Sequence, residues 1–247
     1  MKTQHLRPAL IVALLVLSHA WSRADSIPEI VSKSKLAILD ILAMDATGTP
    51  TKLGTGFFVS PDGLAVTNFH VIDGAASLVA TRSDGVNFLF QRIVCHPPGV
   101  DLVVLQLKAY GVPFLSLGES ADKVEGEKVI VIRNPTRLTW TVSDGIISAF
   151  RENHSYIQMT APISPGSSGS PVLDQGGKVI GVATLMSLEE RNLSFAIPVE
   201  EVSAALAFST PQIGTSDKRF RAAGHPTNTA GAATEQFRAS IRKPVRQ

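Results

Sequence analysis

A serine stands in the middle of a loop rich in glycine and serine, Gly166-Ser167-Ser168-Gly169-Ser170. A serine hydroxyl is a weak nucleophile at neutral pH, so it needs a base beside it and donors for the oxyanion that its attack creates. Flanking glycines let backbone N–H groups point at one spot without a Cβ in the way. A loop of this composition is by itself typical of a polar surface turn. Ser168 is therefore a candidate nucleophile only if the chain supplies a base.

Two other residues could complete such a site. His70 follows an apolar run, residues 64–68, and Asp101 opens another, residues 102–107. Taken singly, such a histidine is more often a buried core residue, and such an aspartate is as often a turn residue. Together with Ser168 they stand in the order His, Asp, Ser, which chymotrypsin-like enzymes use and subtilisins and α/β-hydrolases do not. The three residues together predict a catalytic triad.

Short strands must position these residues. Brief apolar runs are separated by turn signals such as residues 60–63, which is typical of an all-β sandwich or barrel. Two series of six strands are expected on either side of a linker at about residues 111–123, followed by one helix over residues 199–208. The expected strands are residues 36–44, 54–59, 64–68, 77–81, 87–94, 102–107, 128–132, 139–150, 155–160, 171–173, 179–185 and 194–197.

Five motifs in this order resemble those of the HtrA/Deg serine proteases, which have the trypsin-like fold of the chymotrypsin superfamily. The resemblance covers about residues 30–205 and implies two six-stranded antiparallel β-barrels, about residues 35–115 and 120–200, with the active site between them. The motifs are Gly54-Thr55-Gly56-Phe57-Phe58-Val59, Thr67-Asn68-Phe69-His70-Val71-Ile72, Asp101-Leu102-Val103-Val104-Leu105, Gly166-Ser167-Ser168-Gly169-Ser170-Pro171 and Leu193-Ser194-Phe195-Ala196-Ile197-Pro198.

The resemblance implies a role for each matching residue. Ser168 would be the nucleophile, and His70 the general base and then the general acid. Asp101 would hold the imidazole tautomer, and the backbone N–H groups of Gly166 and Ser168 would form the oxyanion hole. The implied activity is that of a serine endopeptidase acting on unfolded or damaged exported polypeptides.

The resemblance also places Pro162, Ile163, Ala183 and Thr184 in the pocket for the substrate side chain. The segments that carry them contain no carboxylate, whereas a preference for Lys or Arg would need a buried Asp or Glu. We therefore expect cleavage after small or medium aliphatic residues.

Three positions depart from the family pattern. Ser167 stands where Asn is usual, Ser170 where Gly is usual, and Arg133 where Gly usually precedes Asn-Pro. Only about 40 residues follow the expected helix, too few for the PDZ domain that HtrA proteins usually carry, so a protease domain alone is expected. Two alternatives therefore stay open, which are an inert or latent trypsin-fold binding or chaperone module and an esterase-like acyl hydrolase.

The first 24 residues are typical of a secretory signal peptide, with basic Lys2 and Arg7 before an apolar run and cleavage after Ala20 or Ala24. The protease domain would span residues 25–207, in a protein that is periplasmic or secreted, without a membrane span in its mature form. The resemblance also implies a homotrimer as one possible assembly, since members of the family often form trimers through N-terminal segments.

Residues 208–247 carry 7 basic and 2 acidic side chains, whereas residues 25–207 carry 13 and 19. The tail is poor in large apolar residues, so a disordered basic extension is expected, with no nucleic-acid partner.

Cys95 is the single cysteine, and it is expected to pack as a small apolar residue because its neighbour His96 should point to the opposite strand face. The sequence offers no other Cys/His cluster, so neither a metal nor another cofactor is expected.

Overall fold

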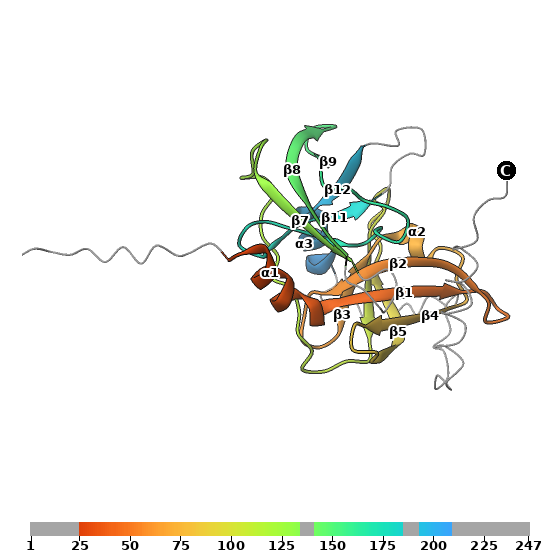
Figure 1. Cartoon of the computed structure of the whole chain (residues 1–247). Coiled ribbons are helices and arrows are strands. Elements are labelled where there is room, and N and C mark those ends of the chain that lie inside the picture. Colours follow the sequence, from red (N-terminus) through yellow and green to blue (C-terminus); the bar gives the residue numbers. More distant parts are fainter. Residues whose placement is uncertain (1–24, 134–140, 185–192, 209–247) are drawn as a thin grey trace, which may run out of the picture.

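The computed structural model describes residues 25–133, 141–184 and 193–208. Within these residues, twelve strands form two closed antiparallel β-barrels, and the helix α3 (Val199–Phe208) follows the last strand (Figure 1). The predicted all-β fold with two barrels and a C-terminal helix is thereby confirmed. The predictions for the signal segment and for the tail beyond residue 208 lie outside the described residues.

The first barrel has the strand order β1-β2-β3-β6-β5-β4, and pairing of β1 with β4 closes it. Tight turns join most of its strands, and Gly63 and Gly85 take positive φ values of 93° and 87° in two of them. Its strands are β1 (Ile38–Met44), β2 (Pro50–Phe58), β3 (Leu64–Thr67), β4 (Ser77–Arg82), β5 (Asn87–Cys95) and β6 (Val103–Leu107).

The second barrel has the order β10-β11-β12-β9-β8-β7, and it is closed by pairing of β10 with β7. In Figure 1 it lies above the first barrel. Its strands are β7 (Lys128–Arg133), β8 (Thr141–Arg151), β9 (Tyr156–Met159), β10 (Pro171–Leu173), β11 (Val179–Thr184) and β12 (Ser194–Pro198).

Three apolar clusters hold this arrangement together. One fills the first barrel around Phe58 and Phe90, and another fills the second barrel around Ile157. The third joins side chains of both barrels, such as Phe57 and Ile130, and includes the buried residues of α3. Successive residues of a strand point to opposite faces of the sheet. Side chains on the inner face can therefore fill a barrel, while those on the outer face pack between the two barrels.

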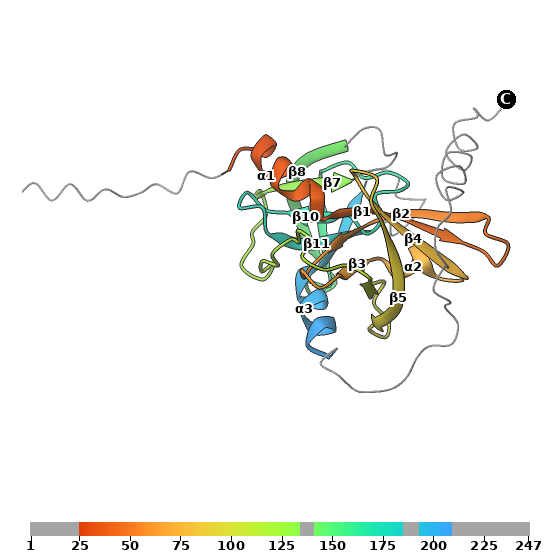
Figure 2. The same cartoon turned by 90° about the horizontal axis from the view of Figure 1, so that it is seen from below.

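Two helices cover the cluster between the barrels. The helix α1 (Ile27–Ser34) begins with a capping box, in which the backbone N–H of Ser26 donates to the Glu29 carboxylate at 2.8 Å. The short turn η1 (Lys35–Ala37) leads from α1 into β1, and α3 lies against the region where the barrels meet (Figure 2). No helix among the described residues is long and apolar enough to cross a membrane.

Glu200 ties α3 to the segment that links the two barrels. Its carboxylate accepts the backbone N–H of Ser120 at 2.7 Å, the Ser120 hydroxyl at 2.5 Å and the backbone N–H of Ala121 at 3.2 Å. Burial raises the pKa of this carboxyl, but the hydrogen bonds from Ser120 and Ala121 outweigh burial and leave the pKa below its usual range. The folded state therefore favours the ionised form of Glu200.

Glu200→Gln is expected to lower the free energy of unfolding at neutral pH by about 1 kcal/mol, a modest loss because the side chain is exposed. The folded-state pKa lies below the unfolded value of about 4.3, so this stability is present above that pH and is lost as the pH falls through the folded pKa. Urea unfolding from neutral to acidic pH should show the two proteins converging in acid. Glu201→Gln is the control, and an equal loss there would contradict the assignment.

Candidate active site

Pairing of β3 with β6 brings His70 and Asp101 together. Thr67, the last residue of β3, lies opposite Val103, the first residue of β6. His70 follows on the one-turn helix α2 (Phe69–Ile72), and Asp101 lies two residues before the start of β6. Two residues far apart in the sequence are thereby placed at the same end of one barrel.

The Asp101 carboxylate holds His70 by two hydrogen bonds. His70 Nδ1 lies 2.6 Å from Oδ2, and the backbone N–H of His70 donates to Oδ1 at 2.9 Å. An ionised carboxylate can only accept, so Nδ1 carries the proton in this bond, and Nε2 is the free acceptor of a neutral ring. Such a ring is set up to take a proton through Nε2.

Other contacts keep Asp101 ionised and oriented. The Thr184 hydroxyl donates to Oδ2 at 3.1 Å, and the Asn68 amide donates to the Asp101 backbone carbonyl at 2.8 Å. Burial raises the pKa of this carboxyl, but the two hydrogen bonds from His70, together with the bond from Thr184, bring the pKa below its usual range. The carboxylate is therefore charged at neutral pH and can stabilise an imidazolium beside it.

His96 packs against the same helix, a contact that the sequence did not predict. Its ring stacks on Phe69, with centroids 3.7 Å apart and an interplanar angle of 8°. Its Nδ1 lies 2.9 Å from the carbonyl oxygen of Leu102, which can only accept. Cys95 instead packs against the cluster between the barrels, where burial raises the pKa of its thiol. The expected separation of these two neighbours is found.

Thr55 of β2 braces the serine loop against the first barrel. Its backbone N–H donates to the Ser168 carbonyl at 2.8 Å, and its hydroxyl donates to the Gly166 carbonyl at 2.8 Å. The Thr55 carbonyl in turn accepts the Thr67 hydroxyl at 2.6 Å. The loop that carries the candidate nucleophile is thus fixed to the barrel that carries His70 and Asp101.

Close packing at Thr55 explains one glycine of the loop. Gly169 has a φ of 85°, and a Cβ there would overlap the Thr55 carbonyl oxygen and the Thr67 hydroxyl. Ser170 lies outside the positive-φ residues of the described chain, so its Cβ causes no backbone strain. Its hydroxyl is buried without a hydrogen-bond partner among the described residues.

Ser168 lies close to the helix that carries His70. A Cβ on Gly54 would meet the Val71 methyl groups at 2.6 and 2.7 Å and the Ser168 carbonyl oxygen at 3.2 Å. Ser168 is buried, whereas the His70 side chain is 46% exposed. No hydrogen bond between the Ser168 hydroxyl and the His70 ring is present in the described chain. Such a bond is often long in an enzyme without substrate and shortens when substrate binds.

The predicted oxyanion donors make no hydrogen bond to another described residue. The backbone N–H groups of Gly166 and Ser168 have no acceptor among the described residues, whereas the N–H of Ser167 donates to the Ser164 carbonyl at 2.8 Å. Gly166 has a φ of 90°, and its carbonyl points to Thr55. The small Ser167 fits here, fully buried, with its hydroxyl accepting the backbone N–H of Ser164 at 3.1 Å.

The four predicted pocket residues fall into two groups. Pro162 is exposed and Ile163 is half-buried against the core of the second barrel. Ala183 and Thr184 are buried, and the Thr184 hydroxyl serves Asp101. Residues 185–186, which belong to the same predicted pocket segment, lie outside the described residues.

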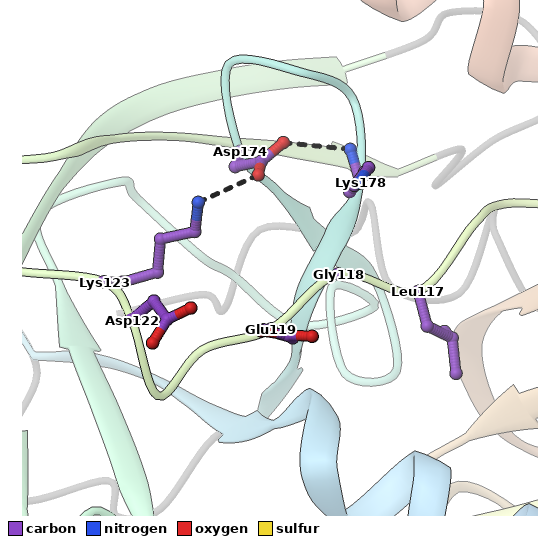
Figure 3. Close-up of a pocket in the computed structure, with 7 residues that line it drawn as sticks. All are labelled: Leu117, Gly118, Glu119, Asp122, Lys123, Asp174 and Lys178. Carbon is purple, nitrogen blue, oxygen red and sulfur yellow. Dashed lines mark hydrogen bonds and ion pairs between the residues drawn. The ribbon is translucent and has the colours of Figure 1, made fainter.

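A polar cavity of about 280 Å³ lies between the barrel linker and the β10–β11 hairpin (Figure 3). Lys123 reaches across it to the Asp174 carboxylate at 3.0 Å. None of its lining residues belongs to the candidate triad, and a second cavity of about 290 Å³ lies beside α1. The described residues contain no group of three or more His, Cys, Asp or Glu that could hold a metal ion.

Comparison with known proteins identifies the family. The family described as "Trypsin-like peptidase domain" matches residues 54–182, more than half of the chain. This chain belongs to the trypsin-like peptidase family. The matched segment contains His70, Asp101 and the strands around them, so these residues lie within the trypsin-like peptidase domain.

This trypsin-like peptidase is similar in sequence to serine proteases of the HtrA/Deg group. It is 41% identical over 155 residues to the "Probable periplasmic serine endoprotease DegP-like" of Chlamydia trachomatis, which covers 59% of this chain and 31% of that protein. It is 37% identical over 171 residues to "Serine protease HTRA1" of Xenopus tropicalis, with coverages of 65% and 36%. The chain thus spans about a third of the length of these relatives.

Solved structures of serine proteases have the same fold. A serine endoprotease from Yersinia pestis superposes with a TM-score of 0.66 and 26% identity, covering 75% of this chain and 66% of that one. The HtrA-type protease AlgW with a tripeptide superposes with a TM-score of 0.64 and 30% identity, covering 74% and 62%. The predicted resemblance to HtrA/Deg proteases is confirmed.

Gly169→Ala is expected to destabilise this trypsin-like peptidase by about 3 kcal/mol, because a positive φ costs roughly 1–2 kcal/mol and the clash with Thr55 adds about the same. Gly74→Ala is the matched control, since Gly74 has a φ of 76° and open space around it. Urea unfolding of both variants separates backbone strain from the clash. If both variants lose the same free energy of unfolding, contact with Thr55 is not the reason that residue 169 must be a glycine.

Proposed function

We propose that this protein is a serine endopeptidase, with Ser168 as nucleophile, His70 as general base and Asp101 as its partner. The observation that carries this proposal is the charged Asp101 carboxylate holding His70 Nδ1 at 2.6 Å, in the barrel to which Thr55 ties the Ser168 loop. This pairing leaves Nε2 as the proton acceptor. The HtrA/Deg relationship supports the same reading.

The proposed reaction has two halves. The Ser168 oxygen attacks the peptide carbonyl carbon while its proton passes to His70 Nε2, and Asp101 stabilises the imidazolium. The C–N bond then breaks, and His70 gives the proton to the leaving amine, which leaves an acyl group on Ser168. His70 then takes a proton from a water molecule, whose oxygen attacks this ester. The C–O bond to Ser168 breaks, His70 returns the proton to the serine oxygen, and the acid product leaves as its carboxylate.

The backbone N–H groups of Gly166 and Ser168 are the proposed donors to the oxyanion in both halves. They suit this role because neither has an acceptor among the described residues, and because Thr55 holds the loop that carries them. Loss of one such donor in a serine protease costs about 3–4 kcal/mol of transition-state stabilisation.

A latent or inert binding module is the second candidate, and one observation favours it. The Ser168 hydroxyl has no hydrogen bond to the His70 ring in the described chain, so the triad is complete in its residues but not in its contacts. An esterase-like acyl hydrolase would use the same residues on a different substrate.

Polypeptides exported from the cytoplasm are the proposed substrates, and the periplasm is the proposed location before a secreted one. The name of the Chlamydia trachomatis relative, which contains the word periplasmic, supports the location. The apolar segment within residues 1–24 is its sequence basis. A homotrimer is the assembly to test.

Reaction with a fluorophosphonate probe tests the activated serine. We expect covalent labelling of the purified protein and its loss in Ser168→Ala, because only a serine next to a base and an oxyanion hole attacks this phosphorus. Ser170→Ala is the control, since its buried hydroxyl lies two residues away and should leave labelling intact. An unlabelled but folded wild-type protein would favour the binding module. Cleavage of casein against that of a short ester separates peptidase from esterase.

Cleavage specificity follows from the residues near the loop. We expect a peptide library to be cut after Ala, Val or Leu, because the segments with Pro162, Ile163, Ala183 and Thr184 carry no carboxylate. Mass spectrometry of the products identifies the residue before each cut. Cuts mainly after Arg or Lys would contradict the prediction.

A further inference from the structure

Lys52 of β2 reaches the backbone of the helix that carries His70. Its ammonium donates to the carbonyl oxygen of His70 at 2.9 Å and to the carbonyl oxygen of Asp73 at 2.7 Å. The side chain belongs to neither the predicted triad nor the predicted pocket. Through Lys52, a cationic side chain binds the backbone of His70, the candidate general base.

The helix α2 needs such support because it has four residues. A single turn is not stable by itself, and the last carbonyls of a helix have no partners within it. On its N-terminal side, Asp101 holds the backbone N–H of His70 at 2.9 Å. On its C-terminal side, the N–H of Asp73 closes the turn onto the Phe69 carbonyl at 2.9 Å, and Lys52 binds the carbonyls of His70 and Asp73.

The strand β2 also packs against the side of α2. Gly54 lies two residues after Lys52, and the Val71 methyl groups occupy the space that a Cβ on Gly54 would need. The strand therefore contacts α2 at two points, through packing at Val71 and through the ammonium at the His70 carbonyl. Rotation of the turn would break both hydrogen bonds of Lys52.

We propose that Lys52 is a positioning residue, which acts through the His70 backbone to hold the imidazole in place for Ser168. This inference rests on the proposed peptidase function, because it assigns Lys52 a part in the reaction of the same site. Asp101 fixes one edge of the ring, and Lys52 fixes the backbone from which the ring projects. The two contacts together define the direction of Nε2.

Kinetics of Lys52→Met test this role. We expect kcat to fall roughly tenfold with KM little changed, since displacement of a catalytic group by about 1 Å can cost roughly a hundredfold. Lys52→Arg keeps a cationic donor and should retain most of kcat. Lys108→Met removes an exposed lysine of the same barrel and should match the wild type. A tenfold loss in Lys108→Met, or no loss in Lys52→Met, would overturn the proposal.

A second readout does not depend on turnover. The proton of the short His70 Nδ1–Asp101 bond should give a far-downfield NMR signal, assigned by its loss in His70→Gln. We expect this signal to shift or broaden in Lys52→Met and to return in Lys52→Arg. An unchanged signal in Lys52→Met would overturn the proposal even if the wild type proves inactive. An inactive wild type with a signal that depends on Lys52 would instead refute only the proposed peptidase function.

If Lys52→Met does not fold, Lys52→Gln replaces it, because the shorter amide cannot reach both carbonyls and keeps the polarity of the site. Thermal melting of each variant shows whether it is folded. A loss of kcat that follows the melting temperature in every variant, with no rescue by Arg, would show a structural role only and would overturn the assignment.

Discussion

The hydrogen bonds at Thr55 are the constraint on which the rest of the site depends. His70 and Asp101 belong to the first barrel and Ser168 to the second, so the proposed triad can form only if the barrels hold one relative position. The apolar cluster between the barrels supplies cohesion, but apolar burial is not directional. The two bonds that Thr55 donates, to Ser168 and Gly166, are directional and define where the loop lies.

Asp101 shows the same dependence in its electrostatics. A partly buried carboxylate is costly unless donors surround it. Its donors come from both barrels, since His70 lies on the first and Thr184 on the second. The lowered pKa of Asp101 is the net result, in which these hydrogen bonds outweigh burial. The charge that stabilises His70 thus requires the same barrel packing that positions Ser168.

Much of this could be read from the sequence, and the remainder has a physical reason. Turn residues and apolar alternation predicted all twelve strands of the described chain, and β2 alone begins four residues earlier than expected. Its first residue, Pro50, lacks a backbone N–H, and the polar Thr51 and Lys52 follow, so this stretch shows none of the apolar alternation typical of a strand. His70, Asp101 and the Ser168 loop could be selected as candidates because the proposed chemistry needs those side chains. Thr55 and Lys52 could not, because they act on backbone carbonyls, which any residue type presents.

The three residues of the proposed triad differ in exposure, and this difference indicates what a substrate would add to the site. Ser168 is buried at 4% exposure, whereas the His70 and Asp101 side chains are 46% and 33% exposed. A peptide lying across His70 would exclude water from the ring and from its bond to Asp101. The attraction between imidazolium and carboxylate strengthens as the local dielectric falls. In the proposed reaction, the His70–Asp101 pair is already formed by the fold while it is still in contact with water, and it therefore reaches its full strength only in the complex with the peptide, where the proton is transferred.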